Sequence, residues 1–206
     1  AAVIWFGADF FARDVFFMPY AAFALKTLAP TVWIMAYLGV FRGYFQGQGT
    51  MVPTAFSQVF EQIVNAIISV AAGSFLFNEA LTEVLKNQTG TGYSNAWGAA
   101  GGTIGTGAGA FTALIFLLFL FAISRNVRRR QIRRDQTEFA ESYKEITRVL
   151  FFTVVPVILS SAIYNLNSVL DNGILAYNFK TLGQGDEFAS IWGVYTGKYH
   201  LLINVP

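Results

Sequence analysis

The 206-residue sequence has no cysteine, a single histidine (His200) and few charges. Without thiols, the chain cannot form a disulfide framework, a thiolate zinc site or an iron–sulfur cluster. One histidine cannot build a multi-histidine metal centre. Charged residues make up 13% of the chain, whereas a soluble domain has about 25%. Hydrophobic residues make up 54%, so the composition indicates an integral membrane protein.

Motifs for catalysis are also missing from the sequence. It contains no nucleophile elbow, P-loop, HExxH motif or Ser/His/Asp arrangement. The glycine-rich stretch GAAGGTIGTGAGA is not followed by lysine and lies in an uncharged region, which argues against a phosphate cradle. Gly101, Gly105 and Gly109 instead form a small-xxx-small ladder, which predicts close helix packing in a membrane. The function that remains is transport rather than chemistry.

Long uncharged stretches predict the membrane spans, because crossing the hydrocarbon core takes about 20 mostly apolar residues. They predict an all-α, polytopic membrane helix bundle with incomplete spans at both ends. Since the sequence begins with alanine and stops within an apolar segment, we interpret it as an internal piece of a longer protein. The expected complete helices are 30–47, 53–77, 98–123 and 147–178.

The distribution of basic residues predicts the orientation. Short cytoplasmic loops are enriched in Lys and Arg, which places the segment between the last two complete spans in the cytoplasm. The 42–52 turn is then also cytoplasmic, and the 78–97 loop lies outside. The basic residues in the cytoplasmic segment are Arg125, Arg128, Arg129, Arg130, Arg133, Arg134, Lys144 and Arg148.

Two predicted spans carry polar side chains at spacings of three and four, which place them on one face of each helix. Such a face cannot lie against lipid, where each unsatisfied polar group costs several kcal/mol. It faces either other helices, as interhelical glue, or a watery cavity. Glu61 and Asp171 favour the cavity, because ionisable residues within spans usually mark a substrate or ion path. The stripes comprise Thr54, Gln58, Glu61, Gln62, Asn65 and Ser69, and Ser161, Tyr164, Asn165, Ser168, Asp171 and Asn172.

The run RGYFQGQGTMVPTAFSQVFEQIVN, from Arg42 to Asn65, resembles a signature of the multidrug/oligosaccharidyl-lipid/polysaccharide flippase superfamily. The match is to helix 4, the turn and helix 5, especially in the polysaccharide-biosynthesis branch. That branch includes stage V sporulation protein B-like proteins and MurJ-type lipid II flippases. PVILSSAIYNLNSVLD is similar to helix 7, and IWGVYTGKYHLLINVP to the start of helix 8. The cytoplasmic turn motif consists of Arg42, Gly43, Gln46, Gly47 and Pro53.

The resemblance implies a fragment, from about helix 3 to helix 8, of a fold with two six-helix lobes around a central cavity. Residues 1–123 are then the end of the N-terminal lobe, and 148–206 the start of the C-terminal lobe. Between them, 124–147 is a basic cytoplasmic linker with a short amphipathic helix. The helix is indicated by the spacing of Phe139, Tyr143 and Ile146.

The family exports lipid-linked oligosaccharides across the bacterial plasma membrane by alternating access, so the resemblance implies a flippase and not an enzyme. The implied cargo is lipid II or a related polyprenyl-diphosphate sugar, coupled to Na⁺ or H⁺ with no other cofactor. The implied partners are this lipid, the bilayer and the remaining helices, without nucleic acid. The expected cavity residues are Gln58, Glu61, Asn65, Ser161, Tyr164, Asn165 and Ser168.

Two residues have further expectations attached to them. Asp171 matches a helix 7 acid that belongs to a sodium site in the lipid II flippases, so the resemblance implies a sodium ligand. Arg42 lies outside the helices on which the family carries its diphosphate-binding arginines. We therefore expect Arg42 to contact the turn or a lipid headgroup.

Three other interpretations stay open at this point. A multidrug/cation antiporter of the same superfamily shares the fold but takes amphipathic cations. A membrane-embedded glycosyltransferase or polymerase acts on the same lipid carrier, although the 78–97 loop offers few charges for such chemistry. A scaffold without transport activity accounts for the basic linker but not for two carboxylates within spans.

Overall fold

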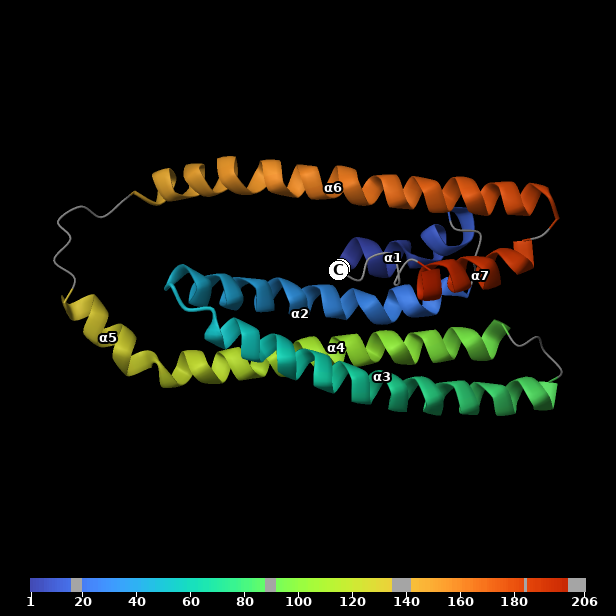
Figure 1. Ribbon diagram of the computed structural model, residues 1–206, viewed down its shortest axis with the longest axis horizontal. Coiled ribbons are helices and arrows are strands. Elements are labelled where there is room, and N and C mark those ends of the chain that lie inside the picture. Colours follow the sequence, from blue (N-terminus) through green and yellow to red (C-terminus); the bar gives the residue numbers. More distant parts are fainter. Residues whose placement is uncertain (16–19, 88–91, 135–141, 184, 200–206) are drawn as a thin grey trace. The chain divides into compact units, whose positions relative to one another are not determined.

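A computed structural model describes residues 1–15, 20–87, 92–134, 142–183 and 185–199 (Figure 1). The described residues form two units. The first holds α1 to α5, and the second holds α6 and α7. The helices are α1 (Ala2–Phe10), α2 (Ala21–Gly47), α3 (Val52–Asn87), α4 (Gly92–Ile123), α5 (Arg125–Arg134), α6 (Tyr143–Thr181) and α7 (Gly185–Val194), with π-helical turns at Phe11–Val15 and Tyr195–Tyr199.

Four of these helices, α2, α3, α4 and α6, are long and apolar enough to cross a membrane. Their number matches the four complete spans that the uncharged stretches predict, and no described residue lies in a strand. The prediction of an all-α, polytopic membrane helix bundle is therefore confirmed.

The expected loop at 78–97 is wrong, because most of it is helical. α3 continues to Asn87 and α4 begins at Gly92. The reason is that Ala80 and Val84, each 5% exposed, extend the buried face of α3, while Glu79 and Glu83 are exposed. At 1.5 Å per residue α3 is about 54 Å long, well beyond a hydrocarbon core of about 30 Å. Glu79 and Glu83 mark the end of the membrane-buried part of α3, but the helix itself continues to Asn87.

The second helix also starts earlier than expected, at Ala21 rather than near residue 30. Pro30 lies inside α2, which is tolerated in membrane helices because neighbouring groups can satisfy the freed backbone. Lys26, a charged residue near the start of this helix, is paired with Asp9 of α1 at 2.9 Å. A charged residue near the start of a span is therefore accommodated by a short helix beside it.

Within the first unit, α4 packs along α3 and also contacts α2, and Figure 1 shows α3 crossing α4. The glycine ladder makes this crossing close. A Cβ added to Gly105 would collide with the backbone of Ser69, and one added to Gly101 would lie 2.6 Å from Ala72. Since real Cβ atoms do not approach so closely, these positions require glycine. The packing role predicted for the ladder is confirmed.

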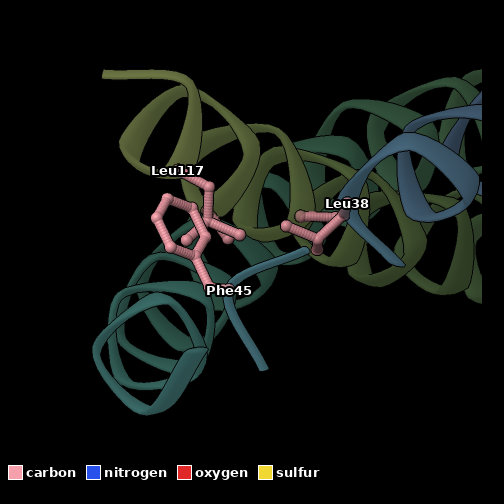
Figure 2. Close-up of a cluster of buried hydrophobic side chains, with 5 residues drawn as sticks. Leu38, Phe45 and Leu117 are labelled. Carbon is pink, nitrogen blue, oxygen red and sulfur yellow. The ribbon is translucent and has the colours of Figure 1, made fainter. Parts of the chain in front are cut away.

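The α2–α4 contact is mainly apolar. Its buried centre is formed by Leu38 and Phe45 of α2 and Leu117 of α4, together with two alanines of α4, and Figure 2 shows these side chains meeting. One polar contact crosses the same interface, a hydrogen bond between Thr27 and Thr103. In lipid such interfaces gain stability from van der Waals packing and interhelical hydrogen bonds, not from leaving water.

The second unit contains α6, which α7 contacts. α6 begins at Tyr143, four residues before the predicted start, and continues through Pro156. Tyr143 and Ile146, expected in a separate amphipathic helix, therefore form the first turn of α6, while Phe139 lies outside the described residues. The helix that the structure describes in the predicted linker is α5, which carries the arginines.

Candidate functional site

The α2–α3 turn is shaped by the motif residues that follow Arg42. The Thr50 amide donates to the Phe45 carbonyl, and the Gly49 amide donates to the Gln46 carbonyl. This is the Schellman pattern that ends many helices. Gly49 has a φ of +78°, a conformation that suits glycine. The turn reverses the chain, so that the last turns of α2 lie beside the first turns of α3.

Pro53 stands in the first turn of α3, as the sequence predicts, where its missing N–H has no intrahelical partner to lose. Gly43 and Gly47 have open space where a Cβ would stand. Their side of α2 is therefore free of contacts from the described residues. Gln46 and Gly49 form the turn, and Arg42 points across it toward α3.

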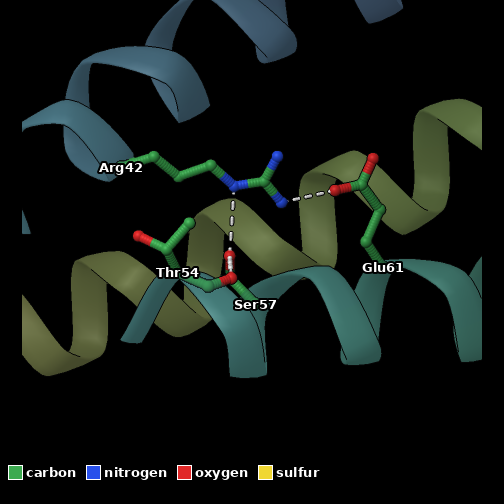
Figure 3. A network of polar contacts seen from close by, with 4 residues as sticks. All are labelled: Arg42, Thr54, Ser57 and Glu61. Atoms are coloured by element: carbon green, nitrogen blue, oxygen red, sulfur yellow. Dashed lines mark hydrogen bonds and ion pairs between the residues drawn. The ribbon is translucent and has the colours of Figure 1, made fainter. Parts of the chain in front are cut away.

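Arg42 and Glu61 form a nearly buried ion pair between α2 and α3. The distance from Arg42 Nη2 to Glu61 Oε2 is 2.6 Å, and the side chains are 16% and 11% exposed. Arg42 Nε also donates to Ser57 Oγ at 3.1 Å. Ser57 Oγ in turn donates to the Thr54 carbonyl at 2.7 Å. Figure 3 shows how Arg42 reaches from one helix to two successive turns of the other.

This arrangement gives Arg42 a partner that the sequence did not suggest. Its side chain contacts α3, where a carboxylate and a hydroxyl stand opposite it. It also supplies the partner of Glu61, which the sequence left unassigned. Removing either charge would leave the other nearly buried without compensation. Ser57 is a contact residue that sequence reasoning missed, although its place four residues before Glu61 was a usable signal.

The hydroxyl of Thr54 is an exception in this well-bonded region. Thr54 is 5% exposed, and its Oγ1 has no hydrogen-bond partner within the described part of the chain. A buried hydroxyl without a partner costs stability. In Figure 3 this hydroxyl points away from the guanidinium, so Thr54 contributes its carbonyl, and not its side chain, to the Arg42 network.

Further along α3, the polar side chains contact α4. Ser69 Oγ lies 2.7 Å from Asn65 Oδ1 and 3.0 Å from the Gly102 carbonyl oxygen, so its one proton can be donated to either. Thr106 of α4 also donates to Asn65, at 3.5 Å. These are interhelical hydrogen bonds of the kind that hold membrane helices together. Asn65 and Ser69 therefore lie in a helix contact.

Gln58 and Gln62 separate from the rest of the stripe, since both are exposed while Glu61 is buried. The geometry of the helix explains the split. Gln58 follows Ser57, and Gln62 follows Glu61, by one position, and one position rotates the side chain by about 100°, so both glutamines point away from the contact that Ser57 and Glu61 make with α2. Ser57 and Glu61 stay on the inner side. The stripe on α3 therefore divides by exposure, with the two glutamines exposed and Glu61 buried.

The polar face of α6 has a different character. Ser161, Tyr164 and Asn165 are exposed, Tyr164 by 79%. The Asn165 amide donates to the Ser161 carbonyl one turn earlier, at 2.7 Å. This bond is made within the helix. The side chain of Ser168, also expected in the cavity, lies outside what the structure describes.

Asp171, the predicted sodium ligand, is exposed and accepts a hydrogen bond from Asn167 at 3.3 Å. Among the described residues, no three acidic, histidine or cysteine side chains come together as a metal site. Hard cations take about six oxygen ligands, so these two side chains would form only part of such a site. The role of Asp171 stays a prediction.

The described spans and the charge pair between two of them define an integral membrane protein built as a helical bundle. The chain is similar to stage V sporulation protein B of Bacillus subtilis (strain 168), with 27% identity over 186 residues. The match covers 89% of this chain and 32% of that protein, so the chain spans about a third of its relative's length. This similarity confirms the resemblance to the stage V sporulation protein B-like branch. No family model and no solved structure matches the chain.

Proposed function

We propose that this chain is part of a flippase that exports lipid-linked oligosaccharide across the bacterial plasma membrane. The observation that carries the proposal is the similarity to stage V sporulation protein B over 89% of the chain. The run from Arg42 to Asn65 supports it, because it resembles the same branch. The proposed cargo is lipid II or a related polyprenyl-diphosphate sugar, moved by alternating access.

In this mechanism the polar head of the cargo crosses the membrane through a cavity while its polyprenyl tail stays in lipid. The α6 side chains Ser161, Tyr164 and Asn165 are the candidates for the cavity wall, because they are polar residues on one face of a candidate span. Polar groups in a span need a polar environment. A wet cavity that holds a sugar head provides one. On α3 the matching candidate is Gln58, which is exposed near the cytoplasmic turn.

Glu61 and Asn65 have a different proposed role. Glu61 is paired with Arg42, and Asn65 bonds across to α4. Both therefore hold α3 in place beside the cavity and do not contact the cargo. Their contribution to transport is the stability of the first unit.

Asp171 is the proposed coupling residue. A cation bound there shifts the equilibrium between inward-facing and outward-facing states only by its difference in affinity for the two. We propose that Asp171 contributes one carboxylate and that ligands from beyond the described residues complete the site. The exposed carboxylate, already oriented by Asn167, is suited to this role.

The test uses the full-length protein reconstituted in vesicles with a fluorescent lipid-linked oligosaccharide, whose appearance in the opposite leaflet is measured with and without a sodium gradient. We expect Asp171→Asn to lose the acceleration by sodium while the protein still folds. Asp14→Asn, which removes an exposed acid elsewhere, is the control and should behave as wild type. Sodium dependence retained in Asp171→Asn would remove this residue from the mechanism, and absence of any flipping by the wild-type protein would refute the function.

A further inference from the structure

The proposed transport cycle leaves unused the densest charge on the molecule, the helix α5. Six of its ten residues are arginine and none is acidic. Among those whose side chains are described, Arg125, Arg129, Arg130 and Arg133 are exposed. A general preference of cytoplasmic loops for positive charge accounts for the sign of this segment. It does not require the arginines to lie on a helix joined to a span.

The junction between α4 and α5 fixes the height of these arginines relative to the membrane. Helical hydrogen bonding runs through Ser124, whose amide donates to the Leu120 carbonyl and whose carbonyl accepts from the Arg128 amide, each at 3.0 Å. Figure 1 shows α5 turning away from the axis of α4 directly after this junction. α4 is a candidate span, and its last residues, 111–123, are uncharged and almost entirely apolar, so we place the start of α5 where the span leaves the hydrocarbon core.

One arginine secures this geometry. Arg128 folds back onto the last turn of α4, where Nη1 donates to the Phe121 carbonyl at 2.5 Å and to Ser124 Oγ at 2.9 Å. Its guanidinium carbon lies 3.6 Å from the centroid of the Phe121 ring. Arg128 therefore holds the two helices together, while Arg125, Arg129, Arg130 and Arg133 are exposed and available to a partner.

Three of the exposed arginines form a row. Arg125, Arg129 and Arg133 are spaced by four residues, so they lie on one face about 6 Å apart along the helix axis. Guanidinium groups bind phosphate oxygens through two parallel hydrogen bonds. A row of them at the edge of a bilayer is complementary to a layer of negatively charged phosphates.

We propose that the Arg125–Arg129–Arg133 face of α5 binds the headgroups of anionic phospholipids in the leaflet where α4 ends. Continuity with the span favours lipid over nucleic acid, because the junction holds the row at the headgroup layer. The bound lipids anchor the end of the first unit at the membrane surface. This proposal does not depend on which cargo the protein moves.

The test measures binding of phosphatidylglycerol and of phosphatidylcholine with the same acyl chains to the purified full-length protein by native mass spectrometry. We expect phosphatidylglycerol to bind more tightly. Each surface arginine contributes about fivefold to such binding, so Arg125→Gln/Arg129→Gln/Arg133→Gln should weaken phosphatidylglycerol binding about a hundredfold. The affinity for phosphatidylcholine should not change.

Two further variants separate the face from general effects. The triple arginine-to-lysine variant keeps the charge but loses the paired hydrogen bonds, so its affinity should lie between wild type and the glutamine variant. Lys86→Gln removes an exposed charge at the far end of α3 and should bind like wild type. The lysine variant also keeps the test valid if the glutamine variant does not fold.

Three results would overturn the proposal. Wild-type affinity for phosphatidylglycerol in the glutamine variant would show that the row does not bind the headgroups. Equal affinity of the wild-type protein for both lipids would show that charge is not recognised. Displacement of the lipid by excess inorganic phosphate would identify a phosphate site instead of a lipid surface.

Discussion

The polar residues of α3 and those of α6 look alike in sequence but have different surroundings. On α3, Glu61 is bonded to Arg42 of α2, and Asn65 is bonded to Thr106 of α4. On α6, Ser161, Tyr164, Asn165 and Asp171 are exposed, Asn172 is partly buried, and the bond from Asn165 stays within the helix. The same spacing of three and four therefore occurs in a helix contact and on a helix that makes few contacts within its own unit.

The difference teaches that a polar stripe in a span shows only that lipid is not its neighbour. The residues opposite the stripe decide whether it forms interhelical hydrogen bonds or lines a transport cavity. For Glu61 the deciding residue is Arg42, which stands 19 positions earlier in the chain. On α6 the polar and the apolar side chains are alike exposed within their unit, so the proposed cavity rests on the polarity of the stripe and not on its exposure.

The largest expected effect comes from breaking the charge pair. Arg42→Leu leaves the Glu61 carboxylate nearly buried without a cation, which should lower the free energy of unfolding by about 3 kcal/mol. The double variant Arg42→Leu/Glu61→Leu should recover most of this loss, because no charge is left uncompensated. Unfolding of the full-length protein in mixed micelles with increasing denaturing detergent measures both. A single variant as stable as wild type would contradict the structural role of the pair.

The second prediction tests how closely α3 packs against α4. Gly105→Ala places a Cβ against the Ser69 backbone and should destabilise the protein by about 1–3 kcal/mol through overpacking. Gly102→Ala is the matched control, since nothing lies within 4 Å of its Cβ position. The same unfolding measurement should find the control at least as stable as wild type. Equal losses for both variants would mean that the α3–α4 approach is not as close as described.

A third variant addresses the open face of α6. Asn165→Leu should reduce flipping of the fluorescent lipid-linked oligosaccharide severalfold, because a polar group at the proposed cavity is lost. The free energy of unfolding should change by no more than about 0.5 kcal/mol, as for other exposed positions. Transport and unfolding are measured on the same preparation. Normal transport together with a large loss of stability would place Asn165 in a helix contact and remove the contrast with α3.

The smallest expected effect concerns a single hydrogen bond between α3 and α4. Ser69→Ala removes one hydrogen bond between α3 and α4 and should cost about 0.6 kcal/mol, the average for such bonds in membrane proteins. Flipping should stay at the wild-type rate, as measured in the same vesicle assay. A transport defect without a loss of stability would move Ser69 from the helix contact to the passage.

The spans were predictable because uncharged length is a strong signal, but their ends were not. Glu79 and Glu83 ended the predicted helix, whereas Ala80 and Val84 on the opposite side continue its packing. Charged residues indicate that a segment is exposed to water. A helix can still continue there when one of its sides packs against a neighbouring helix, as Ala80 and Val84 do. The sequence therefore locates the membrane-buried part of α3 and not its last turns.

The contacts of the site were harder to predict than the helices. The sequence identified Glu61 as unusual, but its pairing with Arg42 depends on the turn geometry that Gly49 permits. The stripe on α3 was correct as a periodicity, yet Gln58 lies outside the contact because the covered side of α3 near its start is the side of Ser57 and Glu61. Which side of a helix is covered follows from the crossing of α3 and α4, and local spacing does not contain that information.

The most direct test of the central contrast is labelling of single cysteines by a membrane-impermeant thiol reagent. The background is a cysteine-free version of the full-length protein in sealed vesicles, with Asn165→Cys or Asn65→Cys added. The account predicts that the cysteine at 165 is labelled rapidly and is protected by lipid-linked oligosaccharide, while the cysteine at 65 stays unlabelled. Labelling of both at the same rate, or of the cysteine at 65 alone, would contradict it.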